Sequence, residues 1–229
     1  MSTMKVLRYR ITLLDPLFYA REGLYGAYTP PLLHGTAVNG AVAAALNYEP
    51  EKQPLVMSET NGGRNTPRYE NSWDGRDFYF TPAALATPLR YFSEVTKGEN
   101  DGYLFRTAGS ELFRAMTLNY LAPESVFEGF AILPVNLEPP EIIRLGSFRG
   151  KAVLEGEECR HRGRTRDRIA DHPVDPLVTP VSRGVARNMF PYPVIENARV
   201  AEALALSLQD NEWFAAFPAP LVDQLLTRD

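Results

Sequence analysis

The most constraining feature of the chain is a strict alternation of residue types near its start. Apolar side chains at Leu7, Tyr9, Ile11 and Leu13 alternate with Arg8, Arg10 and Thr12. Side chains of a β-strand point to opposite faces in turn, so this pattern predicts a strand with one buried face and two arginines on its open face. Asp15-Pro16 then interrupts the strand.

A helix is predicted after Pro30-Pro31, with Thr36 as its N-cap. Its apolar residues recur at helical spacing, at Val38, Ala41, Val42, Ala45 and Leu46. Asn39 and Gly40 fall on the opposite face, and Tyr48-Glu49-Pro50 ends the helix. Because the apolar face consists of small residues, the helix is expected to lie close to a sheet.

Further strands are predicted from apolar runs bounded by turn residues. They cover residues 78–80, 89–95, 103–107, 125–133, 142–145 and 151–154, with a turn at 97–102, whereas 111–121 fits either a strand or a helix. One strand, one helix and then many strands indicate an α+β domain with long insertions, not a doubly wound sheet.

Two long segments, 49–76 and 155–193, lack apolar periodicity and are predicted to be irregular insertions in a single domain spanning 1–229. The tail is predicted to be helical from 196 to 208. Its apolar residues there follow helical spacing, at Ala198, Ala201, Leu204, Ala205 and Leu208. A short final helix is predicted from Pro220 to Leu226.

Composition limits the classes of function. With 45% hydrophobic residues the chain can bury a core, and its net charge of −4 argues against a bulk polyanion binder. A single cysteine excludes an internal disulfide, which suits a reducing cytoplasm. The N-terminal stretch lacks the apolar run of a signal peptide or membrane helix. We therefore expect a cytoplasmic protein with no membrane association.

The strongest local motif places an arginine at every second position, at Arg160, Arg162, Arg164, Arg166 and Arg168. In an extended segment the five guanidinium groups would project to one side about 7 Å apart, close to the spacing of phosphates along a nucleic-acid strand. Five such contacts to single-stranded RNA would give a salt slope of about −3.5. A solvated loop neutralised by nearby Asp and Glu explains the same residues about as well.

Two further stretches are candidate RNA contacts. Tyr19 and Tyr25 flank Arg21 and would stack unpaired bases, although a turn whose tyrosines cover the core explains the pattern slightly better. The glycine turn 146–151 offers backbone N–H groups and the charges of Arg149 and Lys151 to a phosphate. It lacks the spacing of a P-loop, and an ordinary glycine hairpin is the alternative.

Catalytic motifs are weak. His34 stands just before the helix, where a packed or capping histidine is more common than a base. Cys159 and His161 provide too few ligands for zinc. We expect neither a metal nor a cofactor, and no catalytic residue is assigned.

Four stretches together resemble one family. They are YRITL (9–13) leading to PLFYARE (16–22), LLHGTA (32–37), LAPESVFEGF (121–130) and IRLGSFRGKA (143–152). In order and spacing they are similar to the Cas-five-type (Csc-one) subunit of the type I-D CRISPR Cascade complex, over residues 5–155. Residues 160–168 lie outside this resemblance, so their role depends on charge geometry alone.

The resemblance implies an RRM-like, ferredoxin-like domain of the RAMP superfamily with a β-hairpin thumb. It implies a non-catalytic RNA-binding subunit that caps the 5′ handle of the crRNA in antiviral defence. Its partners would be the large subunit, the first backbone subunit and target DNA near the protospacer-adjacent motif. His34 matches a helix-start position of the family, and 146–151 matches its glycine-containing segment.

Two alternatives remain open. A metal-independent endoribonuclease that processes pre-crRNA would need His34, His161 or Tyr19 as its proton shuttle. A protein-interaction module would make no direct RNA contact.

Overall fold

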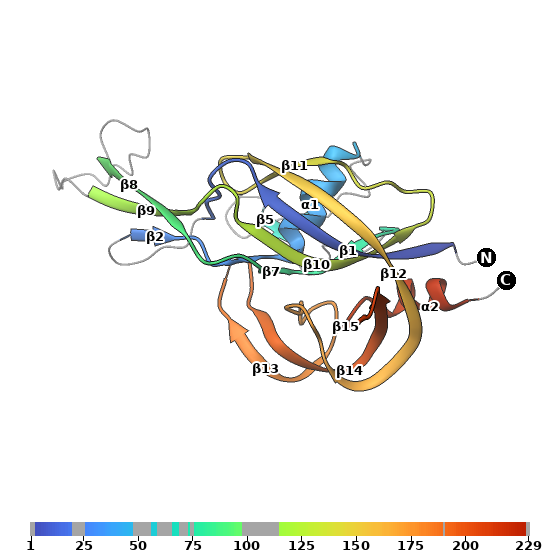
Figure 1. Ribbon diagram of the computed structural model, residues 1–229. Helices are drawn as coiled ribbons and strands as arrows, with labels where there is room; N and C mark the ends of the chain where they lie inside the picture. The colour runs from blue at the N-terminus through green and yellow to red at the C-terminus, as the bar shows by residue number, and fades with distance from the viewer. Residues whose placement is uncertain are drawn as a thin grey trace.

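The computed structural model (Figure 1) describes residues 3–19, 26–47, 56–58, 66–68, 73, 76–97, 115–189 and 191–227. This part of the chain is mostly β-sheet with two helices, and so is richer in strands than the predicted α+β class. The strands are β1 (Met4–Leu13), β2 (Gly26–Tyr28), β3 (Leu32–Leu33), β4 (Val56–Ser58), β5 (Thr66–Arg68), β6 (Tyr79–Phe80), β7 (Ala83–Leu85), β8 (Tyr91–Lys97), β9 (Ala115–Leu121), β10 (Val126–Pro134), β11 (Ile142–Leu145), β12 (Gly150–Ile169), β13 (Val181–Arg187), β14 (Val194–Leu208) and β15 (Asn211–Ala215). The helices are α1 (Gly35–Ala45) and α2 (Ala219–Leu226), and neither is long and apolar enough to cross a membrane.

One large curled sheet organises these elements, in the order β13-β14-β12-β1-β10-β7-β3. Its key strand is β12, which is 20 residues long. The first part of β12 pairs with β1 and the second part pairs with β14, both antiparallel. The strand thereby connects an upper lobe around β1, β10 and α1 to a lower lobe of β13, β14 and β15 (Figure 1).

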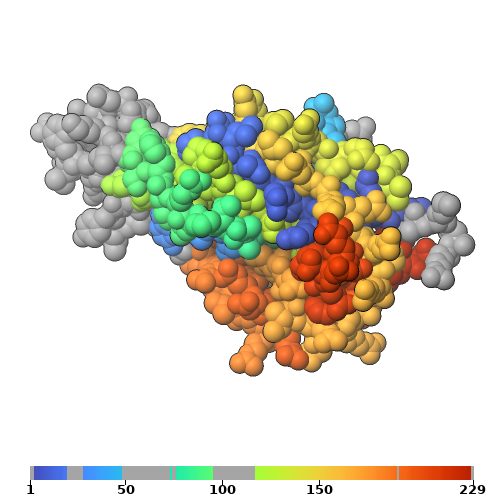
Figure 2. All heavy atoms as spheres, viewed as in Figure 1, coloured from blue at the N-terminus to red at the C-terminus, as the bar shows by residue number. Residues whose placement is uncertain are grey.

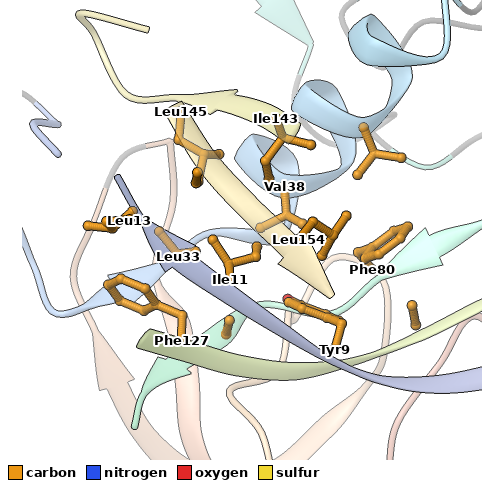
Figure 3. Packing of buried hydrophobic residues seen from close by; sticks show 14 of the residues in the cluster. Tyr9, Ile11, Leu13, Leu33, Val38, Phe80, Phe127, Ile143, Leu145 and Leu154 are labelled. Carbon is orange, nitrogen blue, oxygen red and sulfur yellow. The ribbon is translucent and has the colours of Figure 1, made fainter. Parts of the chain in front are cut away.

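The core of the upper lobe confirms the predicted alternation of the first strand. Tyr9, Ile11 and Leu13 are buried between the sheet and α1, where side chains from β1, β3, β6, β10, β11 and β12 converge (Figure 3). The Tyr9 hydroxyl donates to the Thr81 carbonyl at 2.6 Å, which satisfies its one polar atom. A Cβ on Gly129 would lie 2.7 Å from the Tyr9 ring, so the neighbouring strand needs glycine there.

The start of α1 differs from the prediction in two residues. His34, not Thr36, is the N-cap, because its Nδ1 accepts the Thr36 N–H at 3.1 Å. Asn39, which was predicted to lie on the face opposite the apolar residues, is buried. Its amide donates to the Phe80 carbonyl and accepts the Phe80 N–H, so it joins α1 to β6.

The lower lobe corrects two predictions. Much of the segment predicted to be irregular, 155–193, belongs to β12 and β13, and the predicted helix 196–208 is strand β14. β14 pairs with β12 on one side and with β13 and β15 on the other. Residues on both of its faces are buried, so its apolar residues do not alternate and also fit a helical pattern. The final helix, α2, is confirmed.

Strands β2, β9 and β8 form a separate three-stranded sheet, here called the arm, that extends from the upper lobe (Figure 1). The ambiguous stretch 111–121 is strand β9 from Ala115 onward. The predicted turn at 97–102 is described only at Lys97, and the predicted strand 103–107 lies outside the described residues. Within 49–76, β4 and β5 pair with each other.

Candidate nucleic-acid interface

Three cations gather on the hairpin of β11 and β12. Arg144 pairs directly opposite Lys151 across the ladder, and Arg149 lies in the connecting turn. All three side chains are exposed, and none makes an ion pair with another residue that the structure describes. We call these three residues the basic hairpin. Arg149 and Lys151 were predicted from the sequence, whereas Arg144 was not.

Backbone geometry fixes the shape of this turn. Gly146 has a φ of +76°, and a Cβ there would lie 2.7 Å from both Leu17 Cδ1 and the Phe18 carbonyl oxygen. The Ser147 N–H donates to the Phe18 carbonyl and the Lys151 N–H donates to the Asp15 carboxylate, each at 2.8 Å. These amides are therefore occupied, so the predicted phosphate cradle of backbone N–H groups is wrong at both positions. The side chains of Arg149 and Lys151 remain available, and Arg144 donates one N–H to the Arg149 carbonyl at 3.2 Å.

A row of aromatic rings connects the basic hairpin to the arm. Phe148 stacks on Phe18 at 5.6 Å between ring centroids, and Phe18 contacts Tyr120 at 5.2 Å. Tyr120 in turn contacts Phe92 at 6.0 Å. Phe148 and Phe92 are 47% and 53% exposed, and Phe148 directly precedes Arg149, so an exposed ring lies beside the cations at one end of the row. Exposed aromatic rings next to cations are the elements of a site for single-stranded nucleic acid.

The other predicted contacts of the upper lobe do not join this surface. The Tyr19 hydroxyl is buried and its ring packs against the main core, so it is not placed to stack a base. His34 is buried under Tyr192, with 4.6 Å between the ring centroids, and burial lowers its pKa to about 4. Neither residue is placed to contact RNA. Arg21 and Tyr25 lie outside the described residues.

Arg160, Arg162, Arg164, Arg166 and Arg168, here called the arginine ribbon, lie on the second half of β12. All five are exposed, and the segment is extended as predicted. Their alternation is broken, however, by a register shift between His161 and Arg164 and by positive φ angles at Gly163 and Asp167. The ribbon is therefore not a single-sided row.

Acidic partners neutralise part of the arginine ribbon. Arg162 pairs with Glu212 at 3.4 Å, and Arg164 pairs with Glu202 and with Asp223 of α2. The guanidinium of Arg168 lies over the Phe214 ring, 5.1 Å from its centroid. Side chains engaged in this way are less available to phosphate than those of the basic hairpin.

The two cationic surfaces are separate. Lys151 and Arg160 are nine residues apart on one strand, which corresponds to about 30 Å. Exposed Glu155, Glu157 and Glu158 lie between them. In Figure 2 the arm lies at the left and the lower lobe lies along the bottom of the molecule. A polyanion spanning both surfaces would have to cross this acidic stretch.

Comparisons with known proteins bear on this site. The family model described as "Type I-D CRISPR-associated protein Cas5/Csc1" matches residues 4–219. Two solved structures of a Type III-B Cmr-beta complex, bound to cognate target RNA with and without AMPPnP, each contain a similar chain at 11% identity. The match covers 85% of this chain and 86% of that one, with a TM-score of 0.46, which is too low to support an argument. A search of curated proteins found no match.

Proposed function

Because the chain belongs to the type I-D CRISPR-associated Cas5/Csc1 family, we propose that it is an RNA-binding subunit of a type I-D effector complex, and that the basic hairpin holds the 5′ handle of the crRNA. The observation that carries this proposal is the basic hairpin itself. Its three exposed cations make no ion pair among the described residues, and they lie beside the exposed ring of Phe148, from which the aromatic row leads to the exposed ring of Phe92. Proteins bind single-stranded RNA through cations that contact its phosphates and aromatic rings on which its unpaired bases stack.

The magnitudes fit a subunit that works inside an assembly. An exposed charge contact contributes up to about 1 kcal/mol and one stacked base about 1–3 kcal/mol. Three cations and one or two rings therefore give weak to moderate affinity alone, since a micromolar complex needs about −8 kcal/mol. Neighbouring subunits that hold the same RNA raise the effective concentration. We propose the large subunit and the first backbone subunit as those neighbours, with target DNA close by near the protospacer-adjacent motif.

We propose that the subunit is non-catalytic. A metal-independent nuclease would need an accessible base near the scissile phosphate. Two of the three candidates, His34 and Tyr19, have buried polar atoms, and His161 is far along β12 from the basic hairpin. Cleavage of a repeat RNA by the purified protein in EDTA would contradict the proposal, and an intact RNA is expected.

We also propose which parts of the structure correspond to the domain expected for this family. The antiparallel sheet around β1 and β10, covered by α1, would be the RRM-like unit of a RAMP domain, and the arm would contain its thumb. What supports this is the placement of the arm as a separate sheet beside the basic hairpin (Figure 1).

Two double charge reversals, one in the basic hairpin and one in the arginine ribbon, test the RNA site. The variant R149E/K151E is expected to bind a fluorescent handle RNA at least tenfold more weakly than the wild type, because two phosphate contacts become repulsions. The matched variant R160E/R166E reverses the same number of charges and is expected to stay within about threefold. Fluorescence anisotropy measures both affinities. If the second variant loses more affinity than the first, the handle binds at the arginine ribbon and the assignment is wrong.

A further inference from the structure

A groove lined by both apolar and charged side chains opens beside the arginine ribbon, where β1, the end of β10 and β12 meet α2. Its volume is about 600 Å³. Met4, Val6 and Val135 line it together with Glu158, Arg160 and His161. Lys5 also lines it and is paired with Glu138 at 2.7 Å. Val135 is 51% exposed, so apolar surface faces solvent here. The basic hairpin lies at the start of β12 and takes no part in this groove.

The charges at the rim decide which class of partner fits. Arg160 makes no ion pair among the described residues, and Glu158, two residues away, is exposed as well. Farther along the ribbon, Arg162 is paired with Glu212. A phosphate backbone running past Arg160 would meet Glu158 on one side and the Arg162–Glu212 pair on the other, whereas a protein segment can place one carboxylate on Arg160 alone. Apolar contact surrounded by a polar, mixed-charge rim is the usual anatomy of protein interfaces.

We infer that this groove is a docking site for a protein segment that inserts an apolar side chain against Val135 and places a carboxylate on Arg160. The inference rests on the proposed function in one respect, because it takes the partner to be another protein subunit of the same effector complex. It assigns two parts of β12 to two partners. RNA binds at the start of the strand near Lys151, and protein binds near its middle at Arg160.

The test compares two double variants that each replace one exposed valine with aspartate and one unpaired arginine with glutamate. V135D/R160E puts negative charge in the groove and at its rim. V185D/R183E makes the same changes on β13, where Val185 is 50% exposed and Arg183 has no ion-pair partner among the described residues. Each full-length chain is co-expressed with the other subunits of the complex, and the amount retained by a tagged backbone or large subunit is quantified. RNA affinity of each isolated chain is measured in parallel.

The groove variant is expected to lose at least tenfold in retention while its RNA affinity stays within twofold of the wild type. The β13 variant is expected to match the wild type in both readouts. Unchanged retention of the groove variant would overturn the inference. So would a loss of RNA affinity equal to that of R149E/K151E, or dissociation of a homodimer in light scattering, because these outcomes would make RNA or a second copy the occupant.

Two controls keep the outcomes separable. R160E alone changes an exposed, unpaired side chain and is expected to have the same melting temperature as the wild type. A loss of retention in R160E therefore cannot come from misfolding. If wild-type protein is retained in the complex but binds no handle RNA, the proposed RNA site fails and the docking site stands.

Discussion

At the scale of single residues, Asn39 is the polar group on which the packing of α1 most depends. It is buried and donates to the carbonyls of Gly35 and Phe80 while accepting the Phe80 N–H. We expect Asn39→Ala to lower the free energy of unfolding by on the order of 3 kcal/mol, because buried backbone groups lose their partner. Urea denaturation measures this change. Asn211→Ala, at an exposed position, should change it by less than about 0.5 kcal/mol, and equal effects would contradict the assignment.

His34 and His172 are also buried, and they make stability depend on pH. Burial lowers the pKa of each to about 4, from an ordinary value of 6.5. The unfolded chain therefore takes up protons between pH 6.5 and 4 that the folded chain does not. Stability should be complete above pH 6.5 and fall as the pH drops toward 4, by on the order of 3 kcal/mol for each ring.

Urea midpoints between pH 7.5 and 4.5 check this expectation. His172 accepts the Ala216 N–H through Nε2, so His172→Gln should lower stability at pH 7.5 yet flatten the dependence on pH. Exposed His161 supplies the control, since His161→Gln should leave the profile unchanged. A His172→Gln profile as steep as that of the wild type would refute the role of burial.

At the scale of elements, α2 is held to the lower lobe by apolar contacts and by Arg164. Leu221, Val222 and Leu225 pack into the cluster under β14, and Arg164 pairs with Asp223. We expect Arg164→Ala to change global stability by less than about 1 kcal/mol, because the pair is partly exposed. It should nevertheless speed hydrogen exchange in 219–226, because local opening of a short helix responds to the loss of one contact.

Arg166→Ala is the matched control for this element. Arg166 has no ion-pair partner among the described residues, so its truncation should leave exchange in α2 at the wild-type rate. Equal exchange in both variants, measured by mass spectrometry, would show that Arg164 does not hold α2.

At the scale of the whole molecule, the two separated cationic surfaces set how salt acts on RNA binding. Single-stranded RNA gives a slope of about −0.7 per phosphate contact in a plot of log K against log salt concentration. Three contacts at the basic hairpin should therefore give a slope of about −2. Adding the five arginines of the ribbon would make it far steeper. A titration between 50 and 300 mM salt distinguishes these cases. A slope of −3.5 or steeper would show that the arginine ribbon also contacts the RNA.

The sequence alone determined the features that depend on neighbours along the chain. The alternation of Tyr9, Ile11 and Leu13 predicted both the first strand and its buried face, and helical spacing located α1 and α2. Arg149 and Lys151 were likewise predicted, because a glycine turn and its charges are local. Membership in the Cas5/Csc1 family was also readable from four short stretches, and the family match confirms it.

Only the tertiary structure decided the features that depend on distant residues. β14 is a strand because β12, β13 and β15 pair with both of its edges, while burial on both faces removes the alternation that would reveal it. Phe148 of the hairpin turn and Phe92 of the arm belong to one row of rings only because the fold places Phe18 and Tyr120 between them. The acids that neutralise Arg162 and Arg164 are Glu212 and Asp223, 50 and 59 residues away. The sequence therefore shows where the arginines are, whereas the fold determines which of them can contact a ligand.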